Sequence, residues 1–170
     1  MNFQILETRR LFLKAISSEE MSLIFNQLKK QKIMEILGHR SEQEYLKEEF
    51  KHKNGYASYN RRFKLFLLTD KTSGLIIGRC GFHNWNADHA RSEIGYVMED
   101  ENYKRKGLMG EALETIIDHG FTGMHLNRIE ALVGPENKAS LSLLEKNRFR
   151  KEGVLKQHFK TDKGYEDSVL

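Results

Sequence analysis

Residues 102–113 read NYKRKGLMGEAL and mark the point at which the pattern of the chain changes. Three consecutive basic residues at 104–106 lead into Gly107, and apolar residues recur at helical spacing from there to Thr122, which predicts a helix. The first turn of a helix carries free backbone N–H groups and the positive end of the helix dipole. The stretch therefore predicts an anion-binding site. A solvated basic run before a helix explains the same residues, and local physics leaves both interpretations open.

Two glycines, Gly107 and Gly110, support the anion hypothesis because they allow a ligand to approach the backbone closely. The chain contains neither G-x-x-x-x-G-K-[ST] nor G-x-G-x-x-G, so it lacks both familiar nucleotide-binding loops. The net charge of +4 suits a small anionic ligand and is too low to indicate a nucleic-acid partner.

Upstream of this stretch, short turns join three β-rich segments, which predict an antiparallel meander over residues 62–70, 75–85 and 91–98. Nearer the N-terminus, residues 11–16 predict a strand. Two capping boxes, Ser17 with Glu20 and Ser41 with Glu44, each predict the start of a helix.

Downstream of the stretch, strands alternate with helices. Residues 127–133 predict a strand, Asn137 caps a helix that runs to Asn147, and residues 154–159 and 166–170 predict two final strands. This order favours an α/β (α+β) sheet with right-handed crossovers.

The size and composition of the chain limit its class. Its 170 residues and 19.9 kDa predict one domain over residues 1–170. Cys80 is the only cysteine and the histidines lack metal-ligand spacing, so no disulfide and no metal site are expected. The start of the chain lacks the features of a signal peptide, and the apolar runs are too short to span a membrane. A soluble, cytoplasmic protein without a membrane partner is the expectation.

Residues 104–113 resemble the acyl-CoA pyrophosphate loop of the GNAT N-acetyltransferase superfamily, Q/R-x-x-G-x-G/A at the start of a helix. Lys104 stands at the Q/R position, Gly107 at the glycine and Met109 at the final small residue. Two of these three positions depart from the pattern. Met109 is compatible with the loop because its amide N–H, and not its side chain, would bind phosphate.

Three further segments resemble the same superfamily, in the family's order along the chain. Residues 137–149, NKASLSLLEKNRF, look like N-x-x-S-x-x-L-x-E-K-x-G-F, with Arg148 in place of the glycine. Residues 93–97, EIGYV, resemble the E-I-G-Y strand. Residues 7–13, ETRRLFL, resemble the E-T-E-R-L-x-L start of the RimJ/RimL-type branch, which acetylates the N-termini of ribosomal proteins.

The resemblance implies a GNAT-like fold: a mixed, mostly antiparallel sheet with a V-shaped splay between two central strands, flanked by about four helices. The splay would separate residues 93–98 from residues 127–133 and hold the pantetheine arm of acetyl-CoA near Val97. The N–H group of Val97 or Met98 would polarise the thioester carbonyl. The cofactor loop comprises Arg105, Lys106, Gly107, Leu108, Met109, Gly110 and Glu111, in which the N–H groups of residues 105–107, 109 and 110 would hold the pyrophosphate.

Glu93 is the candidate general base, because an amine acceptor must be neutral to attack. A surface ion pair with Arg91 or another cation is the alternative interpretation of Glu93. Asn137 and Ser140 are predicted to contact the cofactor, and Asn137 also reads as a simple helix cap.

The sequence leaves open which group delivers a proton to the departing thiolate. Leu144 stands where many family members carry the tyrosine that protonates this thiolate. Ser140 is the first candidate acid, with Tyr96, Tyr103 or water as alternatives.

The predicted function is acetyl-CoA-dependent transfer of an acetyl group directly to a primary amine. The branch resemblance favours a protein or peptide N-terminal α-amine, while an aminoglycoside, a polyamine or an amino acid stays open. A non-catalytic acyl-CoA-binding protein is the second hypothesis.

The acceptor side would be walled by residues 19–53 and 54–62. Three residues at the end of the second meander strand, His83, Trp85 and Asn86, are further acceptor candidates, and so are Asn54, Tyr56, Tyr59 and Asn60. The chain is expected to be a monomer or a homodimer, because a short last strand would leave a sheet edge open.

Overall fold

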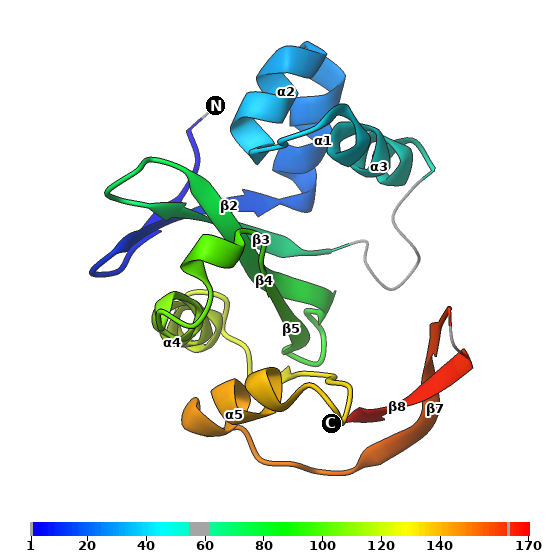
Figure 1. Ribbon diagram of the computed structural model, residues 1–170. Coiled ribbons are helices and arrows are strands. Elements are labelled where there is room, and N and C mark those ends of the chain that lie inside the picture. Colours follow the sequence, from blue (N-terminus) through cyan, green and yellow to red (C-terminus); the bar gives the residue numbers. More distant parts are fainter. Residues whose placement is uncertain (1, 55–61, 163) are drawn as a thin grey trace.

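The computed structural model describes residues 2–54, 62–162 and 164–170. Its centre is one six-stranded sheet with helices on both faces (Figure 1). The strands follow one another in space in sequence order: β1 (Ile5–Glu7), β2 (Leu11–Ser17), β3 (Lys64–Asp70), β4 (Ile76–Asn86), β5 (Arg91–Met98) and β6 (Arg128–Glu130). The predicted meander is confirmed, and β1 is a strand that the sequence patterns did not indicate.

The first five strands are antiparallel, and β5 pairs with β6 in parallel. This last pairing covers only Arg91–Glu93 of β5 against Arg128–Glu130 of β6, so the rest of β5 is open on that side. The predicted strand over residues 127–133 is therefore too long. It stops at Glu130 because the chain turns away, and Val133 instead pairs with Val169 through two backbone hydrogen bonds of 3.0 and 2.7 Å. The divergence produces the V-shaped splay.

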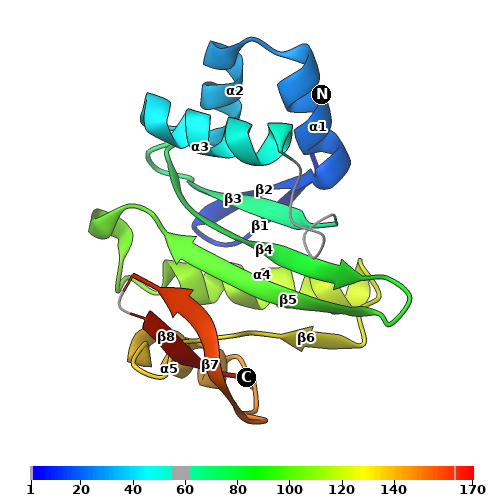
Figure 2. The same cartoon turned by 90° about the vertical axis from the view of Figure 1, so that its right-hand side faces the viewer.

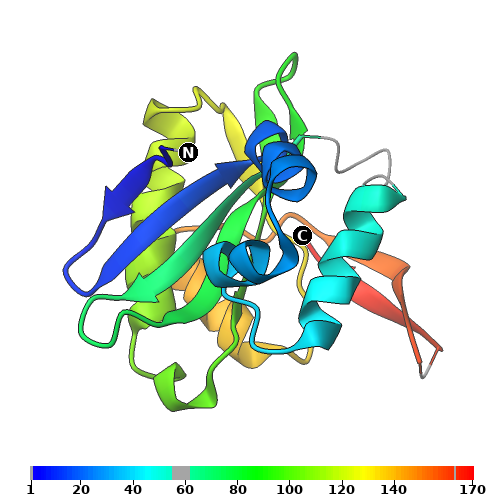
Figure 3. The same cartoon turned by 90° about the horizontal axis from the view of Figure 1, so that it is seen from above.

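Helices cover the two faces of the sheet unequally (Figure 3). One face carries α1 (Ser18–Gln27), α2 (Lys30–Leu37) and α3 (Glu42–Lys53), and the other carries α4 (Leu108–Thr122) and α5 (Lys138–Lys146). The described residues thus form five α-helices where about four were expected. The sequence patterns missed α2 because Lys29, which precedes it, provides no side-chain cap.

Helix capping follows the sequence closely at two sites. Ser17 and Glu20 form a complete capping box at α1. At α3 the box is only half formed, because the Ser41 hydroxyl accepts from the Glu44 N–H, whereas the Glu44 carboxylate accepts from the N–H of Arg40.

Two apolar clusters hold the layers together. Phe66, Leu68 and Phe82 pack on the α4 side, while Ile16 and Leu67 pack on the side of α1–α3. Because β3 is buried on both faces, it reads as a continuous apolar run and shows no alternation.

The last two strands, β7 (Val154–Thr161) and β8 (Gly164–Val169), form a hairpin outside the main sheet (Figure 2). This leaves β6 at the edge of the six-stranded sheet. A cavity of about 790 Å³ lies beside β6, between α5 and residues 147–152, and it includes none of the predicted site residues. Dimerisation through an open edge stays a prediction. Among the described residues, no helix is long and apolar enough to cross a membrane.

Candidate active site

The predicted anion loop lies between a short 3-10 helix, η2 (Glu101–Tyr103), and α4. Gly107 is the N-cap of α4 with a φ of +76°, a left-handed conformation that favours glycine, and Arg105 is also left-handed. Within the described part of the chain, no oxygen accepts a hydrogen bond from the backbone N–H groups of residues 105–110. The N–H of Glu111, in contrast, donates to the Gly107 carbonyl at 3.1 Å. Each N–H group that was predicted to hold the pyrophosphate is thus available to an anion. The N–H of Glu111, which also belongs to the predicted cofactor loop, is already occupied.

The Glu111 side chain bonds to the turn between β1 and β2. Its carboxylate accepts from the Thr8 hydroxyl (2.5 Å), the Arg10 N–H (2.7 Å) and the Arg10 Nε (2.7 Å). Burial raises the pKa of Glu111, but these three hydrogen bonds and the Arg10 charge outweigh burial and lower the pKa to about 2. Arg10 also donates to the Lys106 carbonyl at 3.0 Å. Glu111 therefore anchors the loop to the N-terminal turn, a role that the sequence did not indicate.

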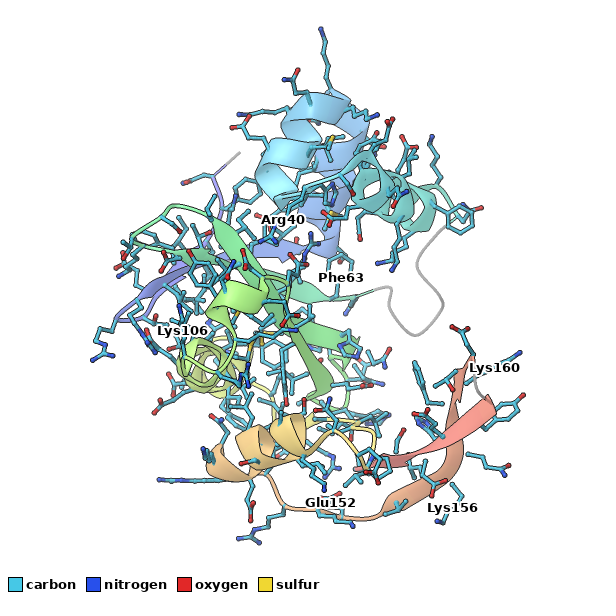
Figure 4. The ribbon with its side chains drawn as sticks, viewed as in Figure 1. Arg40, Phe63, Lys106, Glu152, Lys156 and Lys160 are labelled. Carbon is cyan, nitrogen blue, oxygen red and sulfur yellow. The ribbon has the colours of Figure 1, made fainter. Side chains whose placement is uncertain are left out.

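The basic side chains of the loop are partly engaged with their neighbours. Lys104 pairs with Glu101, and the Lys106 Nζ lies 5.6 Å from the centre of the Tyr103 ring. Lys106 is labelled in Figure 4, beside α4. An anion bound at this loop would meet backbone amides, and the lysines would add positive charge around it.

The start of α5 has the predicted cap, because the Asn137 Oδ1 accepts from the Ser140 N–H at 3.1 Å. Leu144 is buried, with 7% of its surface exposed, and offers no proton donor. Arg148 adopts a φ of +65° just after the helix, which explains why the related pattern has glycine at this position.

Of the two tyrosines considered as acids, only Tyr96 reaches α5. Its hydroxyl donates to the Ser140 carbonyl at 3.4 Å, and burial raises its pKa. The Tyr103 hydroxyl instead donates to the Ser73 Oγ at 3.1 Å, in the turn between β3 and β4. The structure thus brings Tyr96 and Ser140 together and separates Tyr103 from them.

The register of β5 against β4 sets the direction in which the N–H groups of the two candidate oxyanion donors face. Beyond Met98, the N–H of Glu99 donates to the Ile77 carbonyl on the β4 side at 3.0 Å. Hydrogen-bond direction alternates from residue to residue along an antiparallel ladder. In the observed register the N–H of Val97 therefore faces Arg79 on β4, and the N–H of Met98 faces the splay.

A second cavity, of about 390 Å³, lies on the side of β4 and β5 that faces α1 and α3. Its floor contains Gly81 and Gly95, which oppose each other in the sheet register. Phe63, the residue before β3, is part of its lining and is labelled in Figure 4. The cavity meets β5 at Tyr96 and Val97, so an amine held there reaches the strand that borders the splay.

The acceptor candidates from the sequence are only partly brought together in this cavity. His83 belongs to its lining, whereas Asn54, Trp85 and Asn86 do not. Tyr56, Tyr59 and Asn60 lie outside the described residues.

Glu93 does not pair with Arg91, which donates to Glu130 at 3.2 Å. Its Oε1 lies 3.1 Å from the His83 Nε2, and its Oε2 accepts from the Asn84 Nδ2 at 2.9 Å. Burial raises the pKa of Glu93, but the His83 and Asn84 hydrogen bonds outweigh burial, so the pKa is lowered overall. Glu93 is therefore held as a carboxylate with both oxygens occupied.

The remaining reactive residues give no second site. Cys80 is buried, and burial raises the pKa of its thiol, as in an inert core cysteine. Among the described residues, no group of three or more His, Cys, Asp or Glu side chains could hold a metal ion.

Comparison with known proteins gives a consistent result. Residues 10–150 match the family model described as an acetyltransferase (GNAT) domain. The uncharacterised N-acetyltransferase YoaA of Bacillus subtilis is 32% identical over 158 residues, covering 92% of this chain and 88% of YoaA. The [ribosomal protein uS5]-alanine N-acetyltransferase of Escherichia coli is 36% identical over 121 residues, covering 70% of this chain and 58% of that protein. The uncharacterised N-acetyltransferase p20 of Bacillus licheniformis is 43% identical over 95 residues, which cover 56% of this chain and 53% of p20. The chain therefore spans about half the length of p20.

Solved structures show the same fold. The ribosomal-protein-S5-alanine acetyltransferase of Vibrio fischeri superposes with a TM-score of 0.67 at 25% identity, covering 98% of this chain and 94% of that one. RimL, a ribosomal L7/L12 α-N-protein acetyltransferase in complex with coenzyme A, superposes with a TM-score of 0.69 at 21% identity, covering 98% and 95%.

Proposed function

The chain belongs to the GNAT family of acetyl-CoA-dependent N-acetyltransferases, and we propose that it acetylates the N-terminal α-amine of a peptide or protein. One observation carries the proposal: the start of α4, where the amides of residues 105–110 have no acceptor among the described residues, packs with β5 on one face of the sheet, and the 390 Å³ cavity borders β5 on the other face. This arrangement suits a reaction in which the acyl donor and the amine approach one strand from two directions.

The residues of the chain fit an acyl-CoA pyrophosphate. The amides of residues 105–110 would bind it, and the left-handed Gly107 leaves room for it because only the Arg10 guanidinium, at 3.6 Å, would approach a Cβ there among the described residues. The open edge of β5 would pair with the pantetheine, and the Met98 N–H would donate to the thioester carbonyl. Bound in this way, acetyl-CoA supplies an activated acetyl group.

Tyr96 and Ser140 would serve the departing sulfur, since both lie where β5 faces α5. Either hydroxyl can donate a proton to a thiolate. This assignment keeps Ser140 as a candidate acid but ranks Tyr96, the alternative named from the sequence, above it, because the Tyr96 side chain comes from the strand that borders the splay.

The electrostatics of the acceptor cavity support an α-amine over a polyamine. Glu48 is the one carboxylate among the described lining residues, and it pairs with Lys51 at 3.1 Å. Residues 55–61 contain no Asp or Glu. A polyamine with several positive charges would need several unpaired carboxylates, whereas a peptide needs only room for its backbone beyond one amine. The likeness to the uS5-alanine enzyme supports the same acceptor class.

An acetyl-CoA thiol-release assay tests the proposal. We expect release with peptides that begin with alanine or serine, and none with the same peptides carrying a blocked N-terminus. Spermidine, an aminoglycoside and free amino acids serve as competing acceptors. Turnover with spermidine alone would contradict the peptide assignment. Tight acetyl-CoA binding without thiol release for any amine would identify a non-catalytic acyl-CoA-binding protein.

A further inference from the structure

We infer that the imidazole of His83 takes the proton from the acceptor amine, and that Glu93 is a positioning residue that holds this imidazole in the required tautomer. The inference rests on the proposed acetyl transfer. It reverses the order of roles that the sequence predicts, in which Glu93 itself is the base.

The sheet register creates the pair. His83 on β4 and Glu93 on β5 are directly opposed, so both side chains stand on the same face of the sheet. The His83 Nε2 lies 3.1 Å from the Glu93 Oε1, and Asn84 occupies the other carboxylate oxygen at 2.9 Å. With both of its oxygens engaged and its pKa lowered, Glu93 is a weak acceptor for a further proton.

Only His83 of this pair lines the acceptor cavity. Its side chain is 31% exposed, against 15% for Glu93, so the imidazole stands between the carboxylate and the cavity. The His83 ring lies over Gly95: a Cβ at this position would come within 3.0 Å of the His83 Cε1 and 3.5 Å of the Nδ1. Glycine at position 95 therefore gives the ring its space.

The hydrogen bond to Glu93 selects one tautomer. An ionised carboxylate only accepts, so the His83 Nε2 carries the proton and donates it, which leaves a lone pair on Nδ1. Within the described part of the chain, no group forms a hydrogen bond with this Nδ1. The free lone pair belongs to the ring nitrogen that is next to Gly95, in the floor of the cavity.

The transfer step balances with the groups that the two sites provide. The amine nitrogen forms a bond to the acetyl carbon, its proton moves to the His83 Nδ1, and the carbon–sulfur bond breaks with its electron pair leaving on sulfur. The resulting imidazolium faces the Glu93 carboxylate, which stabilises it. Among the described residues, the other charged or titratable groups near the pair include His158 on β7, Glu48 and Lys51 on α3, Arg79 and the buried Cys80 on β4, and Tyr96 on β5.

A double-mutant cycle tests the order of roles. His83→Gln should lower kcat by about 10²–10⁴, the range for general-base catalysis, with acetyl-CoA affinity unchanged. Glu93→Gln should also lower kcat, and the double variant should be no slower than His83→Gln alone, because Glu93 acts through His83. His89→Gln, an exposed histidine in the turn between β4 and β5, is the matched control. Wild-type kcat in His83→Gln beside a slow Glu93→Gln would overturn the inference.

A second measurement does not depend on turnover. Long-range ¹H–¹⁵N spectra of the histidine rings report which nitrogen carries the proton. We expect the Nε2–H tautomer for His83 in the wild-type protein and loss of this preference in Glu93→Gln. An Nδ1–H tautomer, or a ring unaffected by Glu93→Gln, would overturn the inference. Absence of turnover with every amine would count against the proposed function, and the spectra would still decide the His83–Glu93 pairing.

Discussion

The two sides of the candidate active site are built by different means. The loop at residues 104–111 is contiguous in sequence and presents backbone N–H groups, whereas the acceptor cavity takes side chains from α1, α3, β3, β4 and β5. A backbone site tolerates change in its side chains, which explains how Met109 can stand at a position where the related pattern has a small residue. A side-chain site depends on each residue that lines it. The proposed coenzyme half therefore leaves a motif in the sequence, whereas the proposed acceptor half is assembled from residues far apart in the chain.

The contrast between a backbone site and a side-chain site is tested most strongly by changing the backbone of the loop. Gly107→Val should reduce acetyl-CoA affinity about 100-fold or more, because left-handed φ disfavours a β-branched residue by roughly 1–2 kcal/mol and each lost hydrogen bond to an anion costs about 1.5–3 kcal/mol. Isothermal titration calorimetry measures the affinity.

Gly74→Val is the matched control for strain alone. Gly74 has a φ of +71° in the turn between β3 and β4, and a Cβ at this position would have no atom of the described residues within 4 Å. This variant should lose stability but keep its affinity for acetyl-CoA. Equal affinity losses in the two variants would mean that strain, and not the anion site, explains the Gly107 result.

The proton donor for the thiolate gives a smaller effect, because coenzyme A is a tolerable leaving group. Tyr96→Phe should lower kcat by about tenfold to 10²-fold, which is near or below the lower limit for general-acid catalysis. Ser140→Ala should lower kcat by a smaller factor and also cause a modest loss of acetyl-CoA affinity. Steady-state kinetics with a saturating peptide separates the two. Tyr103→Phe is the control, since its hydroxyl is directed to Ser73. Wild-type kcat in both test variants would assign proton delivery to water.

A still smaller effect, on stability, is expected for Glu111, whose side chain holds the loop to the turn between β1 and β2. Glu111→Gln should lower the free energy of unfolding at neutral pH by about 1 kcal/mol. This value is that of one hydrogen bond to a charged group, reduced because the Arg10 side chain is partly exposed to solvent. The folded-state pKa of about 2 lies below the ordinary value of 4.5, so the stabilisation is present above pH 4.5 and is lost as the pH falls toward 2. Thermal unfolding across this range should show the two proteins converging at low pH.

Glu114→Gln, which changes an exposed residue of the same helix, should leave the unfolding curve nearly unchanged. A stability difference between wild type and Glu111→Gln that persists at pH 2 would show that lost packing, and not the ion pair with Arg10, explains the effect.

Local patterns were enough to predict a large part of this molecule. The capping box at Ser17, the cap at Asn137 and the loop before α4 depend on residues close together in sequence, and local hydrogen bonds and backbone conformations fix them. The order of the strands in the meander was predictable for another local reason, the short turns that join them. The proposed anion site belongs to this group because its donors would be the amides at the start of one helix, which have no acceptor among the described residues. Its left-handed Gly107 is likewise a local requirement.

Other features depend on strand register and on contacts between distant segments, so local patterns could not predict them. Glu111 meets Arg10 across 101 residues of sequence, and β6 ends early because Val133 pairs with Val169. The motif placed Glu93 on a strand beside the cleft, but its partner depends on the register that sets His83 opposite it, and a shift of one residue would send the two side chains to opposite faces. Residues adjacent in the chain therefore determine the proposed anion site, and the pairing of β4 with β5 determines that His83 stands beside Glu93.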